Sequence, residues 1–316
     1  MRIFRTAALA VAVAVGLGQT AGAETRITYK SAKAGTSYYQ MAVELAEAVK
    51  KASDGAVIVT VEESQGSVQN VKEAAVRTGN YVFTSPPGLI TRAVAGKKPF
   101  APKNPAFENL RSLFPIPSLT MHFVVRADRG IESFADLSGK TFLIGKGSFG
   151  AREAKRTLEL FGVEGVELID SELSNAVAAL KNGQIDGFAT AGSWPAPNVV
   201  EAAASVPVRI LSMTDAQVEK TGRTRLVIPA GTYPGVDYDV VTTSLPVGAY
   251  TVASMEEEAA YLFTRYFWET REQRAAGSPW WKGVTAEGLA TLAAPLHPGA
   301  RRYYEEAGFA LPASLR

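Results

Sequence analysis

The feature that most constrains the fold is an alternation of short β-rich runs with amphipathic helical stretches, which begins at Glu24. The first series ends in a loop that contains Pro99, Pro102 and Pro105. Because strands that alternate with helices form βαβ units, the pattern predicts an α/β fold with a mainly parallel sheet. The expected strands cover residues 26–29, 57–62 and 81–84, and the expected helices cover residues 38–52 and 68–78, with another from about residue 86.

The same alternation starts again after an apolar segment at residues 121–125. Strands are expected at residues 141–144, 166–169 and 185–189, and helices at residues 151–161 and 175–181. A strand at residues 240–245 then leads into a mostly helical tail. If this tail packs on the first lobe, the chain crosses between lobes near Met121 and Val241. We therefore predict lobe I from residues 24–121 and 241–316, lobe II from residues 122–240, and a hinge of two crossing strands.

Residues 1–23 have the three parts of a secretory signal peptide. Arg2 and Arg5 supply positive charge, small apolar residues fill positions 7–18, and small residues occupy positions 21–23. The apolar run is too short to span a bilayer, which requires about 20 residues. We expect cleavage after Ala23 and a soluble mature protein in the periplasm.

Charge and cysteine content narrow the classes of partner. The chain has 33 Lys and Arg against 31 Asp and Glu, so loss of Arg2 and Arg5 with the signal peptide leaves the mature protein close to neutral. A neutral chain argues against a nucleic-acid partner. Because the sequence has no cysteine, burial alone must hold the exported fold together. We expect a monomer.

Residues 145–150 read Gly-Lys-Gly-Ser-Phe-Gly, a G-x-G-x-x-G motif between a predicted strand and a predicted helix, and Asp170 ends the next strand. This context matches a dinucleotide-binding fingerprint. Three observations argue against a dinucleotide cofactor. The protein is exported to a compartment poor in free NAD, the motif lies in mid-chain, and the bulky Phe149 stands at the helix start. Whatever the ligand, free N–H groups of residues 148–152 at a helix start favour an anion.

Two more segments, residues 34–39 and 66–70, place small hydroxyl residues at a predicted helix start. Such residues are most often helix caps. However, all three helix starts follow the carboxyl end of a predicted strand, which is where open α/β sheets bind ligands.

Catalytic constellations are missing from the sequence. Its two histidines are His122, inside an apolar strand, and His297, at a turn or helix cap, and it has neither a G-x-S-x-G nor an H-E-x-x-H motif. We therefore expect neither an enzyme nor a metal or cofactor.

Seven segments in order along the chain resemble the TAXI family of solute-binding proteins, which serve tripartite ATP-independent periplasmic (TRAP) transporters. They are residues 34–39, 66–71, 136–140, 147–150, 183–188, 228–235 and 297–300. The resemblance implies a two-lobed, type II-like periplasmic binding protein whose cleft closes about a hinge. It also implies TRAP membrane subunits as partners and small carboxylates, such as glutamate and 2-oxoglutarate, as ligands.

Candidate ligand-binding residues come from both lobes. They are Gly35, Thr36, Ser37, Tyr38, Ser67, Asn70, Ser85, Gly147, Ser148, Gly150, Arg152, Ser193, Trp194, Pro195 and Tyr233. Three segments depart from the usual TAXI sequences: the first loop, residues 85–88 and the loop with Phe149. The resemblance therefore predicts the fold and the transport role of this chain better than its substrate. Lys33 and Lys146 flank the candidate loops and are compatible with an anionic ligand.

Arg152 is the basic residue expected to pair with a ligand carboxylate. It is predicted in the first turn of a helix, where a cation opposes the helix dipole. The alternative is a solvated arginine, or one paired with Glu153.

Taken together, the sequence predicts a receptor that binds a small organic anion, such as an acidic amino acid, a 2-oxo acid or a dicarboxylic acid, and delivers it to a TRAP-type permease. Two other classes stay open. One is an exported enzyme, either an oxidoreductase that uses the glycine loop or a hydrolase, and the other is a periplasmic sensor of the same fold.

The signal peptide gives the first testable prediction. N-terminal sequencing of the exported protein should start at Glu24 or within one or two residues of it. Periplasmic protein that still carries Met1 would contradict the assignment.

Overall fold

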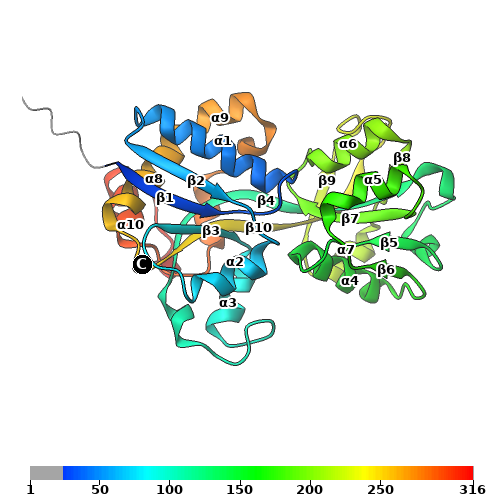
Figure 1. Ribbon diagram of the computed structural model, residues 1–316, viewed down its shortest axis with the longest axis horizontal. Coiled ribbons are helices and arrows are strands. Elements are labelled where there is room, and N and C mark those ends of the chain that lie inside the picture. Colours follow the sequence, from blue (N-terminus) through cyan, green and yellow to red (C-terminus); the bar gives the residue numbers. More distant parts are fainter. Residues whose placement is uncertain (1–23, 316) are drawn as a thin grey trace, which may run out of the picture.

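The computed structural model describes residues 24–315. It has two lobes that lie side by side and share two long strands (Figure 1). These strands are β4, Leu110–Arg126, and β10, Val240–Val252. The strand order is β2-β1-β3-β10-β4-β7-β5-β6, with β8 paired to β4 and β9 paired to β10. The predicted two-lobed α/β fold with a hinge of two crossing strands is therefore confirmed. The lobe boundaries at residues 121 and 241 stay a prediction, and the predicted signal peptide lies outside the described residues.

Lobe I begins with three parallel strands, in the order β2-β1-β3. In the view of Figure 1, α1 and α9 lie above these strands and α2 and α3 below them. The strands are β1 Thr25–Lys30, β2 Val57–Glu62 and β3 Tyr81–Ser85, and the first helices are α1 Ser37–Ala52, α2 Ser67–Ala74 and α3 Pro87–Val94.

Lobe II repeats the arrangement, with α5 and α6 on one side of its strands and α4 and α7 on the other (Figure 1). Strand β5 pairs in parallel with both β6 and β7. The strands are β5 Thr141–Leu143, β6 Glu167–Ile169, β7 Gly187–Gly192, β8 Val208–Ile210 and β9 Thr224–Ile228. The helices are α4 Phe149–Phe161, α5 Ala176–Lys181, α6 Pro197–Ser205 and α7 Asp215–Thr221.

The helical tail packs on β4 and on the helices of lobe I. Its helices are α8 Glu257–Glu269, α9 Arg271–Gly277 and α10 Pro298–Glu306. The hydroxyl of Tyr304 in α10 donates to the carbonyl of Leu113 in β4 at 2.8 Å, and the amide of His297 donates to the carbonyl of Ser112 at 3.0 Å. Short 3-10 helices cover Pro105–Asn109, Ala127–Arg129, Phe134–Leu137, Leu173–Asn175, Pro279–Gly283, Ala286–Thr291 and Ala313–Leu315.

The crossing strands differ from the predicted, mainly parallel sheet. β10 is antiparallel to β3, β4 and β9, and β4 is antiparallel to β7 and β8. β4 also starts eleven residues before the predicted apolar segment at Met121, and it includes Pro115 and Pro117. Proline has no N–H for a strand ladder, and the β4–β10 register shifts nearby, between Leu245 and Val247. The prolines conceal a long strand from an analysis of sequence alone.

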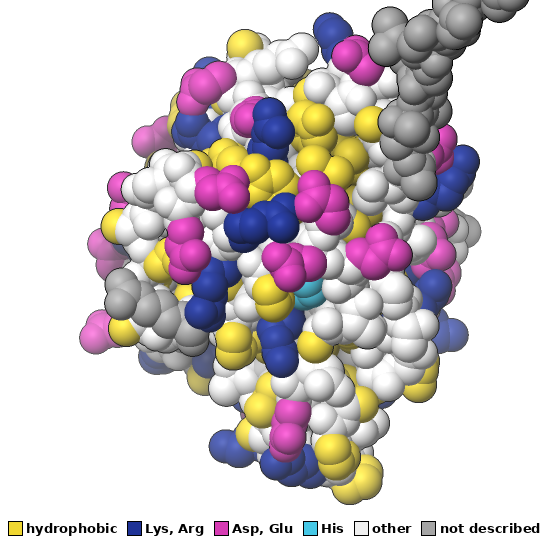
Figure 2. Space-filling model, turned by 90° about the vertical axis from the view of Figure 1, so that its left-hand side faces the viewer, with side chains coloured by type: hydrophobic (Ala, Val, Ile, Leu, Met, Phe, Trp, Pro, Cys, Tyr) yellow, Lys and Arg dark blue, Asp and Glu magenta, His cyan; other side chains and the backbone are white. Residues whose placement is uncertain are grey.

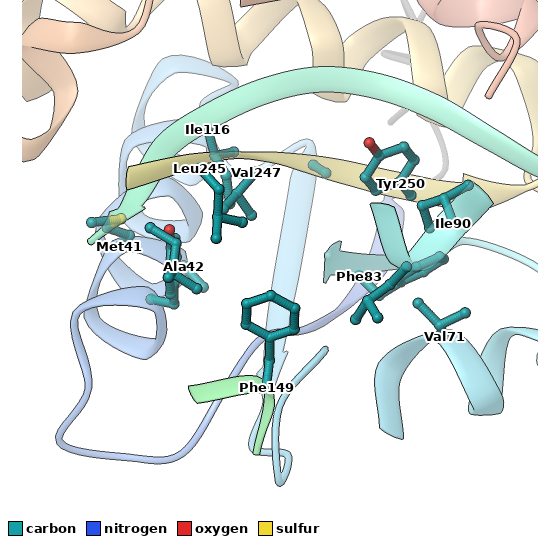
Figure 3. Close-up of a cluster of buried hydrophobic side chains, with 14 of the residues drawn as sticks. Met41, Ala42, Val71, Phe83, Ile90, Ile116, Phe149, Leu245, Val247 and Tyr250 are labelled. Atoms are coloured by element: carbon teal, nitrogen blue, oxygen red, sulfur yellow. The ribbon is translucent and has the colours of Figure 1, made fainter. Parts of the chain in front are cut away.

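The larger hydrophobic core contains buried residues of both lobes. Phe149, the first residue of α4, is 9% exposed and belongs to the larger hydrophobic core. Figure 3 shows its ring pointing into the cluster that contains Ala42, Phe83 and Leu245. The two lobes are thus joined by a buried aromatic side chain as well as by β4 and β10.

The surface carries charges of both signs. Figure 2 shows basic and acidic side chains interspersed over the end of lobe I, and Arg302 there pairs with Glu257 and Glu258. Within residues 24–315, none of the helices combines the length and the apolar character needed to cross a membrane.

Close packing of α10 on α8 gives a stability prediction. A Cβ at Gly299 would lie 2.0 Å from the carbonyl oxygen of Glu257 and 2.8 Å from the amide nitrogen of Tyr261. Gly299→Ala must therefore push the two helices apart, and we expect a loss of at least about 1–3 kcal/mol in the free energy of unfolding, measured in urea. Gly277→Ala is the matched control, because no heavy atom lies within 4 Å of its added Cβ. Equal midpoints for Gly299→Ala and the parent would contradict this packing.

Candidate ligand-binding cleft

A small cavity lies between the lobes where three helices begin. Its lining includes Thr36 and Tyr38 at the start of α1, Ser67 at the start of α2, and Ser148 and Gly150 at the start of α4. The first two helices belong to lobe I and the third to lobe II. The structure therefore brings together all three helix starts that the sequence analysis selected.

The α4 loop leaves backbone donors directed at this cavity. Ser148 caps the helix, because its hydroxyl accepts from the amide of Ala151 at 2.9 Å and donates to the carbonyl of Gly145 at 2.9 Å. Within the described residues the amides of Phe149 and Gly150 have no hydrogen-bond acceptor. A Cβ at Gly66 would lie 3.8 Å from the amide nitrogen of Phe149, so the starts of α2 and α4 face each other. Two positive helix ends across one gap favour an anion.

Two lysines add positive charge to the lining. Lys33, before α1, forms an ion pair with Glu172 of lobe II, which joins the lobes across the cleft. Lys146 is exposed and, among residues 24–315, has no carboxylate partner. Lys146 is therefore free to meet a ligand, whereas Lys33 must exchange its partner to do so.

The cavity measures about 60 Å³ and has largely apolar walls. Leu119, Phe149, Leu173, Ala189 and Ala191 supply these walls. This volume holds a few water molecules, so a ligand requires the lobes to separate slightly. The loop around Gly66 lies against the glycine loop of α4, since a Cβ at Gly66 would lie 3.8 Å from Cα of Ser148.

Two predicted site residues are attached to the hinge strand. The hydroxyl of Tyr38 donates to the carbonyl of Pro117 at 2.9 Å, and that of Ser193 donates to the carbonyl of Ser118 at 2.7 Å. Burial raises the pKa of Tyr38 far above its ordinary value, so the phenol stays neutral. Tyr38 still lines the cavity, whereas Ser193 does not.

Trp194 and Pro195 lie on a different face of the hinge. Trp194 lines a surface groove with Trp280 of lobe I, and the indole N–H of Trp280 donates to the carbonyl of Pro195 at 2.9 Å. These residues connect the lobes but do not line the cleft cavity.

Asn70 and Ser85 are buried and use their side chains within lobe I. Asn70 donates from Nδ2 to the carbonyls of Ser31 and Thr84, at 2.7 and 2.9 Å, and Ser85 donates to the carbonyl of Pro86 at 3.0 Å. Asn70 thereby ties the ends of β1 and β3 together.

Ser37 and the two remaining glycines lie beside the cavity. The buried Ser37 hydroxyl has no hydrogen-bond partner among the described residues and faces Gly192 of lobe II, where a Cβ would lie 2.4 Å from it. Gly35 and Gly147 are exposed, with φ of 81° and 67°. None of the three lines the cavity.

Tyr233 is buried inside lobe II, away from the cleft cavity. Its hydroxyl accepts from the amide of Ala196 at 2.9 Å and lies 2.7 Å from Nε2 of His122. Burial lowers the pKa of His122 to about 4. Tyr233 can therefore donate to a neutral, fully buried histidine.

Arg152 occupies the predicted first turn of α4 but lines a second cavity on the other side of Phe149. Residues that the sequence analysis missed, among them Gln65, Leu119, Leu173 and Thr190, contribute to the cleft cavity. Gln65 and Leu173 follow strands, and Thr190 lies near the carboxyl end of β7. The rule that ligands bind at carboxyl ends of strands was therefore the signal that could have found them.

Comparison with known proteins agrees with this architecture. The sequence model of the NMT1-like family matches residues 30–308. The chain belongs to the NMT1-like family. A solved structure of a protein from Bordetella bronchiseptica RB50 is similar with a TM-score of 0.52 and 14% identity, over 90% of this chain and 98% of that one.

Two further solved structures have TM-scores below 0.5. One is the substrate binding protein of an amino acid ABC transporter (0.47, 12% identity, 81% of this chain and 99% of that one). The other is a TRAP periplasmic solute binding protein from Actinobacillus succinogenes 130z with bound L-galactonate (0.46, 14% identity, 90% and 92%). This NMT1-like chain has two α/β lobes that share the strands β4 and β10. In residues 24–315, no group of three or more His, Cys, Asp or Glu side chains is placed to hold a metal ion.

The buried His122 makes the stability of lobe II depend on pH. Its pKa is about 4 in the folded protein and 6.5 ordinarily, so between these values the unfolded chain binds more protons. Acidification from pH 7 to pH 4 should therefore cost about 3 kcal/mol through this group. Urea unfolding of His122→Gln and the parent at both pH values measures the difference. The parent should lose about 3 kcal/mol more than the variant, and equal losses would contradict the burial of a neutral histidine.

Proposed function

We propose that this chain is a periplasmic receptor that binds a small organic anion in the interlobe cleft and delivers it to a TRAP-type transporter. The ligand class is a small carboxylate, such as an acidic amino acid, a 2-oxo acid or a dicarboxylic acid. The receptor is a binding protein rather than an enzyme.

The convergence of three helix N-termini on one cavity between the lobes carries this proposal. Their free backbone donors and dipoles favour a carboxylate. Lys146 supplies an unpaired cation at the rim, and Ser67 supplies a hydroxyl group. The hydroxyls of Thr36 and Ser148 already donate to the carbonyls of Lys33 and Gly145. The apolar walls suit the short carbon chain of such a ligand.

The contacts across the cleft support a cycle of opening and closing. The Lys33–Glu172 ion pair, the close approach of Gly66 to Phe149 and the packing of Phe149 all join the lobes in this closed form. Because the cavity of this form is too small for a ligand, the bound form is slightly more open, and a ligand that contacts both lobes favours it over a fully open form. The TAXI-like segments support a TRAP permease as the recipient.

A thermal-shift and calorimetric screen of dicarboxylates, 2-oxo acids and acidic amino acids tests the ligand class. A ligand at 100 times its dissociation constant should add roughly 2.7 kcal/mol to the free energy of unfolding. Lys146→Gln should weaken the best ligand by about 1.5–3 kcal/mol, because it removes a hydrogen bond from a charged donor.

Lys51→Gln is the matched control, because this lysine lies in the last turn of α1, at the end remote from the cleft. It should bind the ligand as the parent does. If no carboxylate stabilises the parent, or if Lys146→Gln binds as tightly as Lys51→Gln, the proposed cleft site is wrong.

A further inference from the structure

A second cavity, of about 560 Å³, lies on the other side of Phe149 from the cleft cavity. Phe149 lines both cavities, and Figure 3 shows its ring within a cluster of buried hydrophobic side chains. Lobe I contributes the start of α3, Lys98 and part of β10, and lobe II contributes α4 and Arg223. Small-molecule sites measure about 300–1,000 Å³, so this cavity has room for a ligand of its own.

The lining of this second cavity is strongly basic. Its charged residues are Arg92, Lys98, Arg152, Arg156, Arg223 and Glu153. The Glu153 carboxylate accepts from Nη2 and Nε of Arg223, at 2.7 and 3.1 Å, and Arg156 donates to the carbonyl of Thr221 at 2.9 Å. Within the described residues, Arg92, Lys98 and Arg152 form no ion pair. Glu153, the one carboxylate of this lining, is therefore already paired, and three unpaired cations are available to a ligand.

Arg152 is the most constrained of the three. Its side chain is half-buried, its guanidinium carbon lies 5.5 Å from the centre of the Phe149 ring, and it has no hydrogen bond within residues 24–315. Burial, together with Arg92 of the opposite lobe, lowers its pKa despite the opposing effect of Glu153. Its place in the first turn of α4 also sets it against the helix dipole. A half-buried cation with these three penalties is stabilised when an anion binds.

We propose that this second cavity binds a small anion with at least two negatively charged groups, carboxylate or phosphate, which bridges Arg92 of α3 and Arg152 of α4. Because each lobe presents one of these arginines, an anion with two charged groups can pair with both, whereas a monovalent anion can pair with only one. Because the anion links the lobes, it favours the closed form. This site is separate from the cleft site and does not rest on the proposed function.

Isothermal titration calorimetry with citrate and with inorganic pyrophosphate tests the site, and acetate at matched ionic strength provides the monovalent comparison. At least one multivalent anion should bind with one-to-one stoichiometry and at least about tenfold more tightly than acetate. The tighter of the two then distinguishes carboxylate from phosphate recognition. If neither binds better than acetate, the proposal is overturned.

Arg152→Gln and Arg92→Gln should each weaken the multivalent anion by about tenfold or more, the loss expected from a charge-assisted hydrogen bond. Arg265→Gln is the control, because this arginine is exposed on α8 and pairs with Glu269. It should bind like the parent. The exposed Arg92 keeps the test valid if Arg152→Gln fails to fold.

Lys146→Gln distinguishes this site from the cleft. It should leave citrate or pyrophosphate affinity within twofold of the parent, because Lys146 lines only the cleft cavity. A loss as large as that of Arg152→Gln would mean that one site spans both cavities, and unchanged affinity in both arginine variants would place the anion elsewhere. Either result overturns the proposal of a separate second site.

Discussion

The antiparallel pairing of β4 with β10 is the constraint on which both cavities depend. The two strands belong to both lobes at once, so the lobes can move apart only as far as this ladder bends. Pro115 and Pro117 remove donors from it, and a register shift lies opposite them. Tyr38 and Ser193 donate to carbonyls of β4 in this same part of the ladder. Tyr38, which lines the cleft cavity, is thus attached to the strand that joins the lobes.

Phe149 divides the space between the lobes into two chemically different parts. On one side, helix N-termini and short apolar side chains surround a narrow gap, and on the other side, arginines surround a wider one. Burial of a phenylalanine side chain stabilises by about 1.5–3 kcal/mol, and here that burial is achieved across the interface of the lobes. The closed form thus has a favourable contribution that is independent of any ligand. The same ring prevents a ligand of the cleft from reaching Arg152.

Sequence analysis predicted the lobes, the crossing strands and the return of the tail, because alternating periodicity and strand–helix order are local signals. It missed the full length of β4, since Pro115 and Pro117 read as breaks. The helix starts at Thr36, Ser67 and Ser148 were located correctly because parallel strands bring their carboxyl ends to one edge. The sequence could not show that Asn70 and Tyr233 turn inward to hydrogen-bond within a lobe. That choice depends on tertiary partners such as Thr84 and His122.

The nearly neutral composition conceals a local excess of positive charge between the lobes. Acidic partners there are few and already engaged, since Glu172 pairs with Lys33 and Glu153 pairs with Arg223. Each of these ion pairs holds a loop or helix in place, but it does not neutralise the charge of the neighbouring cation. Lys146 beside the first pair and Arg152 beside the second are left without carboxylates. The proposed selectivity for anions therefore depends on which cations the fold leaves unpaired between the lobes. The effect is stronger at the half-buried Arg152 than at the exposed Lys146, because charges interact more strongly away from solvent.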